Sequence, residues 1–318
     1  MSRDAAEVVT IGESMGLFHA PAGIPIESHP DFRVSFGGAE SNVAIGLARL
    51  GRSVEWIGRL GDDDLGRLIA RELRAERVSV QDRIGGGSTG IMVRTRRGHA
   101  RAFVQYARNG SAGAALSPED LDLEAIRSAR LLHLTGITPA LGAHPREAVD
   151  LAIETAREAG VLVSFDINHR EALWDSGDAH EVLAGIAARS DVLFATDAEG
   201  RLVLGVAEEE LTTAEIAAGL AGLGAPEVIV KMGKRGSLSL VHGARFDQRI
   251  SAADEVDPVG AGDAFAAGYI HALLADDAPQ RRIDFAGEVA AHAVTIAGDW
   301  EGLPRTPDLN HSGADILR

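Results

Sequence analysis

Short apolar runs alternate with amphipathic stretches along most of the chain, which predicts alternating strands and helices. In the expected helix 41–50, Val43, Leu47 and Leu50 fall on one face at the i, i+4, i+7 spacing. Such alternation favours a parallel sheet covered by helices on both faces. The expected strands are 8–11, 54–57, 131–134, 162–166, 192–195 and 228–231, and the expected helices are 41–50, 145–159, 179–188 and 214–223.

Two regions interrupt this alternation. Residues 14–36 are rich in Pro, Gly and His and show no helical pattern. Residues 88–108 hold two β-type runs, 91–93 and 102–106, separated by a polar stretch, which predicts a hairpin. Arginines gather in the same stretch, and we interpret them as part of a solvated hairpin rather than as a track for phosphate groups. They are Arg94, Arg96 and Arg97.

Composition and charge narrow the classes of protein. The 318 residues suffice for one large α/β domain or two smaller ones. The net charge of −16 argues against nucleic-acid binding, and zero cysteines exclude disulfides, a thiolate nucleophile and cysteine-bound metals. Neither an apolar signal region nor an apolar run of membrane length is visible in the sequence. We therefore expect a soluble cytoplasmic protein without nucleic-acid or membrane partners.

The most informative segment is Asp-Pro-Val-Gly-Ala-Gly-Asp at 257–263, followed by an apolar helical run at 264–270. Small residues let the backbone turn tightly, so that several N–H groups and the helix dipole can meet one anion. Asp263 would then stand beside the anion site, where it suits the deprotonation of an attacking hydroxyl. This suggests phosphoryl transfer from a nucleotide to an alcohol. The alternative is an ordinary glycine-rich turn with Asp263 as a helix cap.

Residues 257–270 resemble the C-terminal signature of the PfkB (ribokinase-like) carbohydrate kinases. Pro258 replaces the usual Thr, a form typical of the 2-keto-3-deoxygluconate kinase branch. The resemblance implies an α/β fold, a ribokinase-like three-layer sandwich with a mainly parallel central sheet and a small β-sheet lid. It implies one domain over 1–318, with a discontinuous lid at about 14–36 and 88–108. In the family the final Asp is the base, here Asp263, and the preceding backbone is the anion hole, here Gly260, Ala261 and Gly262.

Four further segments resemble the same branch. They are Gly-Gly-Ala-Glu-Ser-Asn at 37–42, Tyr-Ala-Arg-Asn-Gly-Ser-Ala at 106–112, Asp-Ile-Asn-His-Arg at 166–170 and Gly-Asp-Trp at 298–300. The first departs from the commonest family form by carrying Glu40. An Asn at 42 can donate and accept hydrogen bonds, although it could also cap its own helix, and an arginine fork suits a carboxylate. The resemblance places eight residues around the sugar: Gly38, Asn42, Tyr106, Arg108, Asp166, Asn168, Arg170 and Asp299.

The nucleotide side is expected at two other strand ends. Thr196-Asp197-Ala198-Glu199 lies where many family members have Asn-x-x-Glu, so Glu199 would help to organise hydrated Mg²⁺ indirectly. The segment 231–236 resembles the family's nucleotide-side turn and lacks the Walker A spacing. The expected cofactor-binding residues are Thr196, Lys231, Gly233 and Gly236. ATP and Mg²⁺ are the implied cofactors, and a monovalent cation is left open as a third.

Three alternative functions fit parts of the same sequence pattern. A dehydrogenase is disfavoured because Gly-x-Gly-x-x-Gly is missing after the first strand. A non-catalytic sugar sensor would have no need of Asp263. Another sugar, as in a fructokinase, a ribokinase or a galactonate-derived keto acid kinase, is distinguished by Arg108 and Arg170, which neutral ketoses do not require. The sequence thus predicts an ATP-dependent kinase for the C6 hydroxyl of 2-keto-3-deoxygluconate, paired with another copy through its lid.

Overall fold

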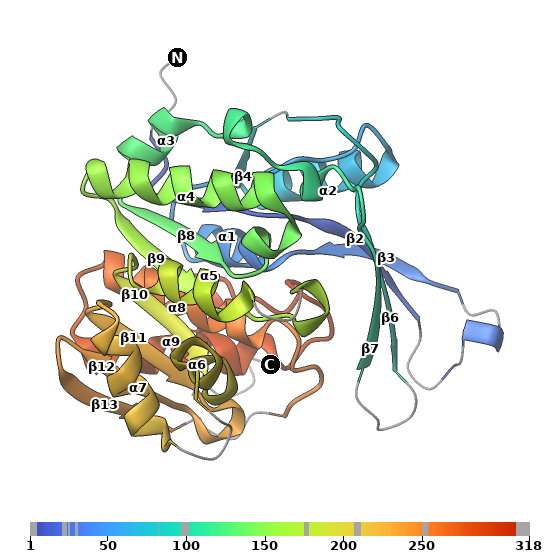
Figure 1. Cartoon of the computed structure of the whole chain (residues 1–318). Coiled ribbons are helices and arrows are strands. Elements are labelled where there is room, and N and C mark those ends of the chain that lie inside the picture. The colour runs from blue at the N-terminus through green and yellow to red at the C-terminus, as the bar shows by residue number, and fades with distance from the viewer. Residues whose placement is uncertain are drawn as a thin grey trace.

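The computed structural model describes residues 5–309, except 21–23, 25, 29–30, 82, 97–101, 175–177, 207–210 and 250–253. Its body is built on a nine-stranded sheet with the order β13-β12-β11-β10-β9-β8-β1-β4-β5 (Figure 1). Neighbouring strands from β5 to β11 run parallel, whereas β12 and β13 are antiparallel additions at one edge. The strands are β1 Val8–Ile11, β4 Val54–Ile57, β5 Ser79–Val80, β8 Leu131–Thr135, β9 Leu162–Asp166, β10 Val192–Thr196, β11 Glu227–Lys231, β12 Ser237–Val241 and β13 Ala244–Gln248.

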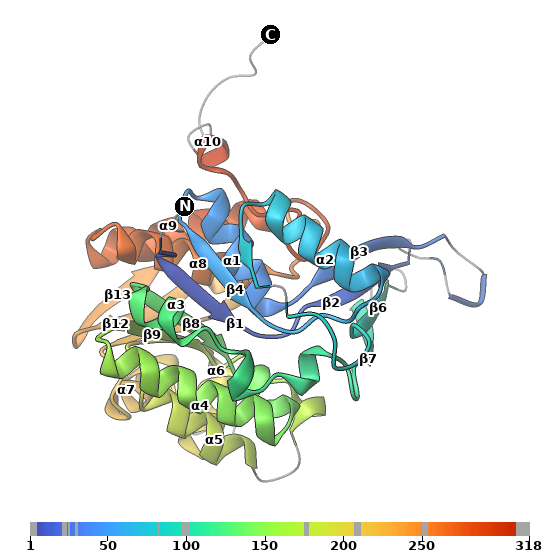
Figure 2. The ribbon, with the colours of Figure 1, turned by 90° about the horizontal axis from the view of Figure 1, so that it is seen from above.

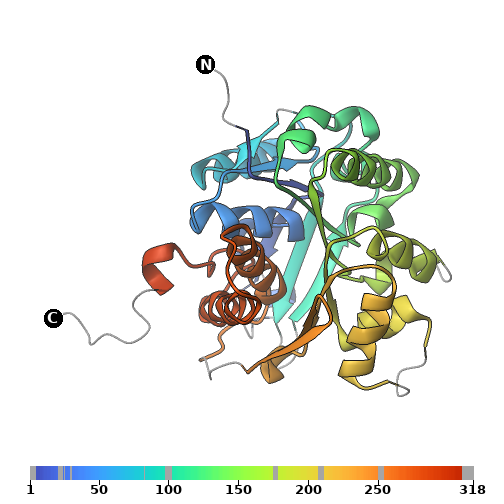
Figure 3. The same ribbon diagram turned by 90° about the vertical axis from the view of Figure 1, so that its left-hand side faces the viewer.

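Helices cover both faces of this sheet, as Figures 2 and 3 show. Side chains of α1, α2, α8 and α9 enter one apolar core, and those of α3 to α7 enter a second core on the opposite face. Within β1, Val8 belongs to the first core and Val9 to the second, because successive strand residues point to opposite faces. The helices are α1 Ala39–Arg49, α2 Asp64–Ala75, α3 Leu123–Ser128, α4 Ala143–Glu158, α5 Asp178–Ala187, α6 Asp197–Leu204, α7 Thr213–Gly222, α8 Ala261–Leu274, α9 Pro279–Ala293 and α10 Thr306–Leu309. Short 3₁₀ turns lie at Ile26–Ser28, Gly113–Ala115, Pro118–Asp120, Thr138–Leu141, Glu171–Leu173 and Gly233–Arg235.

The predicted three-layer sandwich with a mainly parallel central sheet is confirmed. Each expected strand and helix is present within about two residues of its expected bounds. Within the described residues, no helix has both the length and the apolar composition needed to cross a membrane.

A second, four-stranded sheet projects from one side of the body (Figure 1) and is called the small sheet below. Its order is β3-β2-β6-β7, with two antiparallel pairs joined by a parallel contact between β2 and β6. The predicted hairpin is present, because Ile91 pairs with Ala107 and the register continues along both strands. The strands are β2 Met15–His19, β3 Arg33–Gly37, β6 Ile91–Arg96 and β7 Ala102–Ala107.

One expectation about this sheet is wrong. Arg94 is not a solvated hairpin residue: only 7% of it is exposed, and its guanidinium pairs with Asp257 and Asp299 of the body. It lies on the same strand face as buried Met92, two positions earlier, so the period of two places its side chain inward. The side chains of Arg96 and Arg97 lie outside the described residues.

Candidate active site

A cavity of about 450 Å³ lies between the two sheets, at the carboxyl ends of the parallel strands. The small sheet lines it with Leu17, Met92 and Tyr106, and the central sheet with Asp166 and Lys231 at the ends of β9 and β11. This is the position where open α/β sheets bind their ligands. Most of the predicted site residues line it: Gly38, Asn42, Tyr106, Arg108, Asp166, Asn168, Arg170, Thr196, Glu199, Lys231, Gly233, Gly260, Gly262, Asp263 and Asp299.

The glycine-rich turn opens α8 towards this cavity. Gly260 is the N-cap with φ +76°, and a Cβ on it would lie 2.2 Å from the carbonyl oxygen of Asp299. The amide of Ala261 donates to Pro258 over 3.3 Å, whereas those of Gly262 and Asp263 have no acceptor among the described residues. The first turn of α8 therefore keeps free donors and its positive dipole end for an anion.

Gly260→Ala should lower kcat by at least about tenfold, because the new Cβ must displace the turn from the Asp299 carbonyl. Gly243→Ala is the matched control, since Gly243 also has a positive φ, +80°, but would bring its Cβ near no atom. Gly243→Ala should lose about 1–2 kcal/mol of unfolding free energy through backbone strain, and Gly260→Ala at least as much, because the steric clash adds to the strain. Steady-state kinetics and denaturant titration separate the two effects, and equal kcat values for both variants would contradict the role of the turn.

Asp263 stands at the mouth of the turn, in contact with α1. The amide nitrogen of Asn42 donates to its carboxylate over 2.8 Å. Burial raises the pKa of Asp263 to about 7, against the lowering effect of that hydrogen bond, and nearby Asp166 adds to the rise. A carboxylate with a near-neutral pKa that is reached from the cavity is suited to accept a proton from a hydroxyl.

Asn42 does not cap its helix, because Gly38 occupies the N-cap of α1 and Asn42 lies within its first turns. Its backbone N–H donates to the Gly38 carbonyl over 2.8 Å. The side-chain oxygen Oδ1 is buried and has no partner among the described residues. Asn42 can therefore hold Asp263 with one end and accept a ligand hydroxyl with the other.

Lys231 and Asp166 form an ion pair in the cavity wall, in which the carboxylate is buried, the ammonium is partly buried and Nζ lies 2.5 Å from Oδ2. Burial disfavours the charged ammonium, but Asp166, Glu199 and Asp263 outweigh it and raise the pKa of Lys231. A Cβ on Gly262 would lie 3.4 Å from Nζ, so this ammonium is next to the α8 turn. It supplies positive charge where phosphate oxygens would meet the free amides.

Arg108 is paired within the protein, by a carboxylate that the sequence reasoning missed. Glu13, between β1 and β2, accepts from Arg108 Nη2 and, over 2.5 Å, from the hydroxyl of Ser111. Both members of the pair are buried, and Arg108 lies 5.7 Å from the Tyr106 ring centroid. Two glycines signal the arrangement, because Cβ atoms on Gly90 or Gly113 would come within 3 Å of the Glu13 side chain.

Arg170 differs from Arg108 in being exposed. Its only hydrogen bond in the described structure is to the neighbouring His169 carbonyl, over 3.4 Å, and no described carboxylate pairs with it. Asn168, two residues earlier, is buried with φ +40°. Arg170 is therefore a cation of the cavity wall that is free to meet an anionic ligand.

The residues expected on the nucleotide side are only partly gathered at the cavity. Thr196 is the N-cap of α6 and exchanges hydrogen bonds with Glu199, which also accepts from the His169 amide over 3.0 Å. Gly233 lines the cavity, but Gly236 does not: it closes the β11–β12 turn, where a Cβ would lie 1.9 Å from the Gln248 carbonyl. Ala261, which the resemblance places in an anion hole, likewise contributes no surface to the cavity.

Together these groups define a phosphotransferase site for an alcohol. A carboxylate of near-neutral pKa faces the open N-terminus of a helix, beside a partly buried ammonium. Within the described residues, no three His, Cys, Asp or Glu side chains gather closely enough to hold a metal ion. A metal would accordingly need oxygens supplied by the bound nucleotide.

Comparison with known proteins shows the family to which the chain belongs. Residues 5–305 match the model described as pfkB family carbohydrate kinase. A 2-dehydro-3-deoxygluconokinase of Bacillus subtilis is 34% identical over 95% of this chain and 94% of its own length. A 2-dehydro-3-deoxygalactonokinase of Haloferax volcanii is 32% identical over 95% of each. A solved structure from E. coli in complex with ATP and Mg²⁺, provisionally named Ribokinase II, is 25% identical, with a TM-score of 0.88 over 96% of this chain and 98% of that one.

The chain belongs to the pfkB family of carbohydrate kinases. It is a phosphotransferase similar to the 2-dehydro-3-deoxygluconokinases, and its fold is ribokinase-like.

Proposed function

We propose that the protein transfers the γ-phosphoryl group of ATP to the C6 hydroxyl of 2-keto-3-deoxygluconate, also called 2-dehydro-3-deoxygluconate. The observation that carries the substrate class is Arg170, an exposed guanidinium on the cavity wall without a carboxylate partner in the described chain. A sugar acid would supply the missing counter-charge, and a neutral sugar would not. Arg108, which keeps a buried Nε without a partner among the described residues, also lines the cavity.

The residues of the cavity then divide the chemistry between them. Asp263 accepts the proton of the C6 hydroxyl as its oxygen approaches phosphorus, with Asn42 fixing the orientation of the carboxylate. The free amides of the α8 turn and the ammonium of Lys231 stabilise negative charge on the phosphoryl oxygens. These donors fit the phosphates of ATP, and Gly233 lies at the same side of the cavity.

Mg²⁺ would neutralise charge on the ATP phosphates. Glu199 already accepts three hydrogen bonds, so it fits a contact through water better than direct ligation. Asp166 Oδ1, buried and without a partner in the described chain, is a second oxygen for this role.

We further propose that the small sheet is the lid of a single domain covering the whole chain. Its strands place Leu17, Met92 and Tyr106 over the cavity, where apolar side chains would exclude water from the phosphoryl group. The outer surface of this sheet exposes Val34 and Phe103, and we propose that it pairs with a second copy. We place the reaction in the cytoplasm, where ATP is available.

A coupled assay over sugar acids and neutral sugars tests the substrate. We expect kcat/KM for 2-keto-3-deoxygluconate to exceed that for fructose and ribose by at least about 10²-fold, since the guanidinium of Arg170 gains no counter-charge from a neutral sugar. The galactonate-derived keto acid belongs in the same panel, because the two acids differ at one stereocentre. Comparable turnover of fructose or ribose would overturn the substrate assignment and leave the kinase assignment intact.

A further inference from the structure

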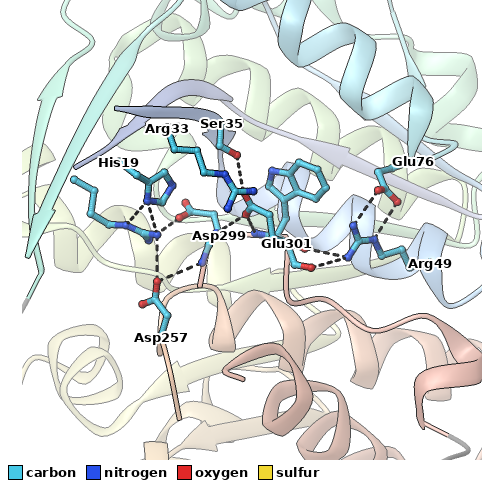
Figure 4. A network of polar contacts seen from close by, with 11 residues as sticks. His19, Arg33, Ser35, Arg49, Glu76, Asp257, Asp299 and Glu301 are labelled. Carbon is cyan, nitrogen blue, oxygen red and sulfur yellow. Dashed lines mark hydrogen bonds and ion pairs between the residues drawn. The ribbon is translucent and has the colours of Figure 1, made fainter. Parts of the chain in front are cut away.

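Arg94 extends from β6 of the small sheet to two segments of the body. Its Nη1 donates to Asp299 Oδ1 over 2.8 Å, and its Nη2 lies 3.2 Å from Asp257 Oδ2. His19, on neighbouring β2, lies 3.0 Å from Nη2 through Nδ1, and Figure 4 shows His19, Asp257 and Asp299 converging from different segments. Burial and Arg94 lower the pKa of His19 to about 4, so at neutral pH its ring is uncharged and accepts.

Both carboxylates belong to segments that meet at the Gly260–Gly262 turn. Asp257 precedes Gly260 by three residues and accepts weakly, over 3.4 Å each, from the amides of Val259 and Gly298. The backbone of Asp299 packs against Gly260, where even a Cβ would not fit. Arg94 is 163 residues from Asp257 and 205 from Asp299 in sequence, so one guanidinium joins three distant parts of the chain.

The two carboxylates depend on this cation. Burial raises the pKa of Asp299 to about 6, against the effect of Arg94, and Glu301 and Asp257 add to the rise. Without Arg94, a buried carboxylate at Asp257 and a partly buried one at Asp299 would face each other with no compensating charge between them. The loops at 257–260 and 298–299 would then move apart, and the first of them leads directly into the α8 turn at Gly260.

We propose that Arg94 is a positioning residue that couples the closed position of the small sheet to the geometry of the Gly260–Gly262 turn. The inference rests on the proposed function, because it assumes that the Gly260–Gly262 turn takes part in phosphoryl transfer. Arg94 lines the cavity, yet each of its three nitrogens already pairs with Asp257, Asp299 or His19, so it acts through the turn and does not bind the sugar. The turn reaches its working geometry only while the lid lies over the cavity.

The test compares Arg94→Met with Arg33→Met. Arg33 is the matched control because it also extends from the small sheet to the loop after α9, pairing with Glu301 over 3.6 Å, but its side chain is 69% exposed (Figure 4). Arg94→Met should lower kcat by roughly 10- to 100-fold while KM for the sugar and Kd for ATP change by less than about threefold. Arg33→Met should keep the kcat of the wild type. Arg94→Lys should recover part of the loss, since an ammonium can pair with one of the two carboxylates.

Several outcomes would overturn the proposal. Equal kcat values for Arg94→Met and Arg33→Met would do so, as would a raised sugar KM at unchanged kcat, which would make Arg94 a sugar ligand. If Arg94→Met does not fold, Arg94→Lys and Asp257→Asn carry the test, and their double variant should lose no more kcat than the worse single one. Additive losses would contradict the coupling. A wild-type enzyme inactive on every sugar would refute the proposed function itself, and with it this role.

Discussion

Asp263→Asn is expected to lower kcat by roughly 10²–10⁴-fold, the usual contribution of a positioned base. The substitution keeps the size of the side chain and its contact with Asn42, but removes the atom that accepts the proton. Affinity for ATP and for the sugar should change little, because the turn amides and the arginines remain. Steady-state kinetics with calorimetric binding measures both quantities, and near-full turnover by the variant would remove Asp263 from this role.

The pH profile gives the same prediction a second readout. With a pKa of about 7, Asp263 is mostly protonated below neutral pH and cannot act as a base. The kcat/KM of the wild type should therefore rise with pH up to about 7 and level off above it. The residual activity of Asp263→Asn should lack this step.

As the pH rises and Asp263 ionises, the free energy of unfolding should fall while the activity rises. The pKa of Asp263 is higher in the folded state than its ordinary value of 3.8, so ionising this group destabilises the fold. The free energy of unfolding should therefore fall as the pH rises from about 4 to about 7. Asparagine carries no such charge, so Asp263→Asn should be at least as stable as the wild type at neutral pH in denaturant titration. A variant that loses both activity and stability would indicate misfolding instead.

Much of the fold and the centre of the site are encoded locally. The strand Leu162–Asp166 was predicted residue for residue, because a short apolar run bounded by polar residues has few other solutions. The turn at Gly260 was predictable because only glycine tolerates its φ of +76° next to the Asp299 backbone. Asp263 directly follows Gly262, the last residue of this turn, so the prediction of the turn also placed Asp263.

The side-chain pairs across the cavity could not be predicted in the same way. Glu13 reaches Arg108 across 95 residues and Arg94 reaches Asp299 across 205, and no periodicity links such distant positions. The polar composition of the hairpin predicts an exposed Arg94. Strand alternation from the buried Met92, two positions earlier, instead places the Arg94 side chain on the inner face of the sheet. Gly236 was assigned to the nucleotide by motif, whereas close packing on Gln248 already explains its glycine.

The Arg108–Glu13 pair leads to the second large effect. Arg108→Gln should lower kcat/KM for the keto acid by roughly 10²–10³-fold, because it removes a cation and leaves the buried Glu13 carboxylate uncompensated beside an anionic substrate. Turnover of a neutral sugar such as fructose should fall far less, since it meets no charge repulsion. The measurement is kcat/KM on both substrates for each variant.

Glu13→Gln changes the other partner of the same ion pair. It is the control, because its expected effect on affinity for the keto acid is opposite to that of Arg108→Gln. It keeps Ser111 and Arg108 within hydrogen-bonding reach, but removes the negative charge that neutralises Arg108. If Arg108 recognises a carboxylate, Glu13→Gln should keep or raise the affinity for the keto acid while Arg108→Gln lowers it. A purely structural pair would instead lose activity on acid and neutral sugar alike from either side. Parallel losses of that kind, with lowered melting temperatures in both variants, would assign Arg108 to the folding of the segment after β7 and leave Arg170 as the residue that reads the acid.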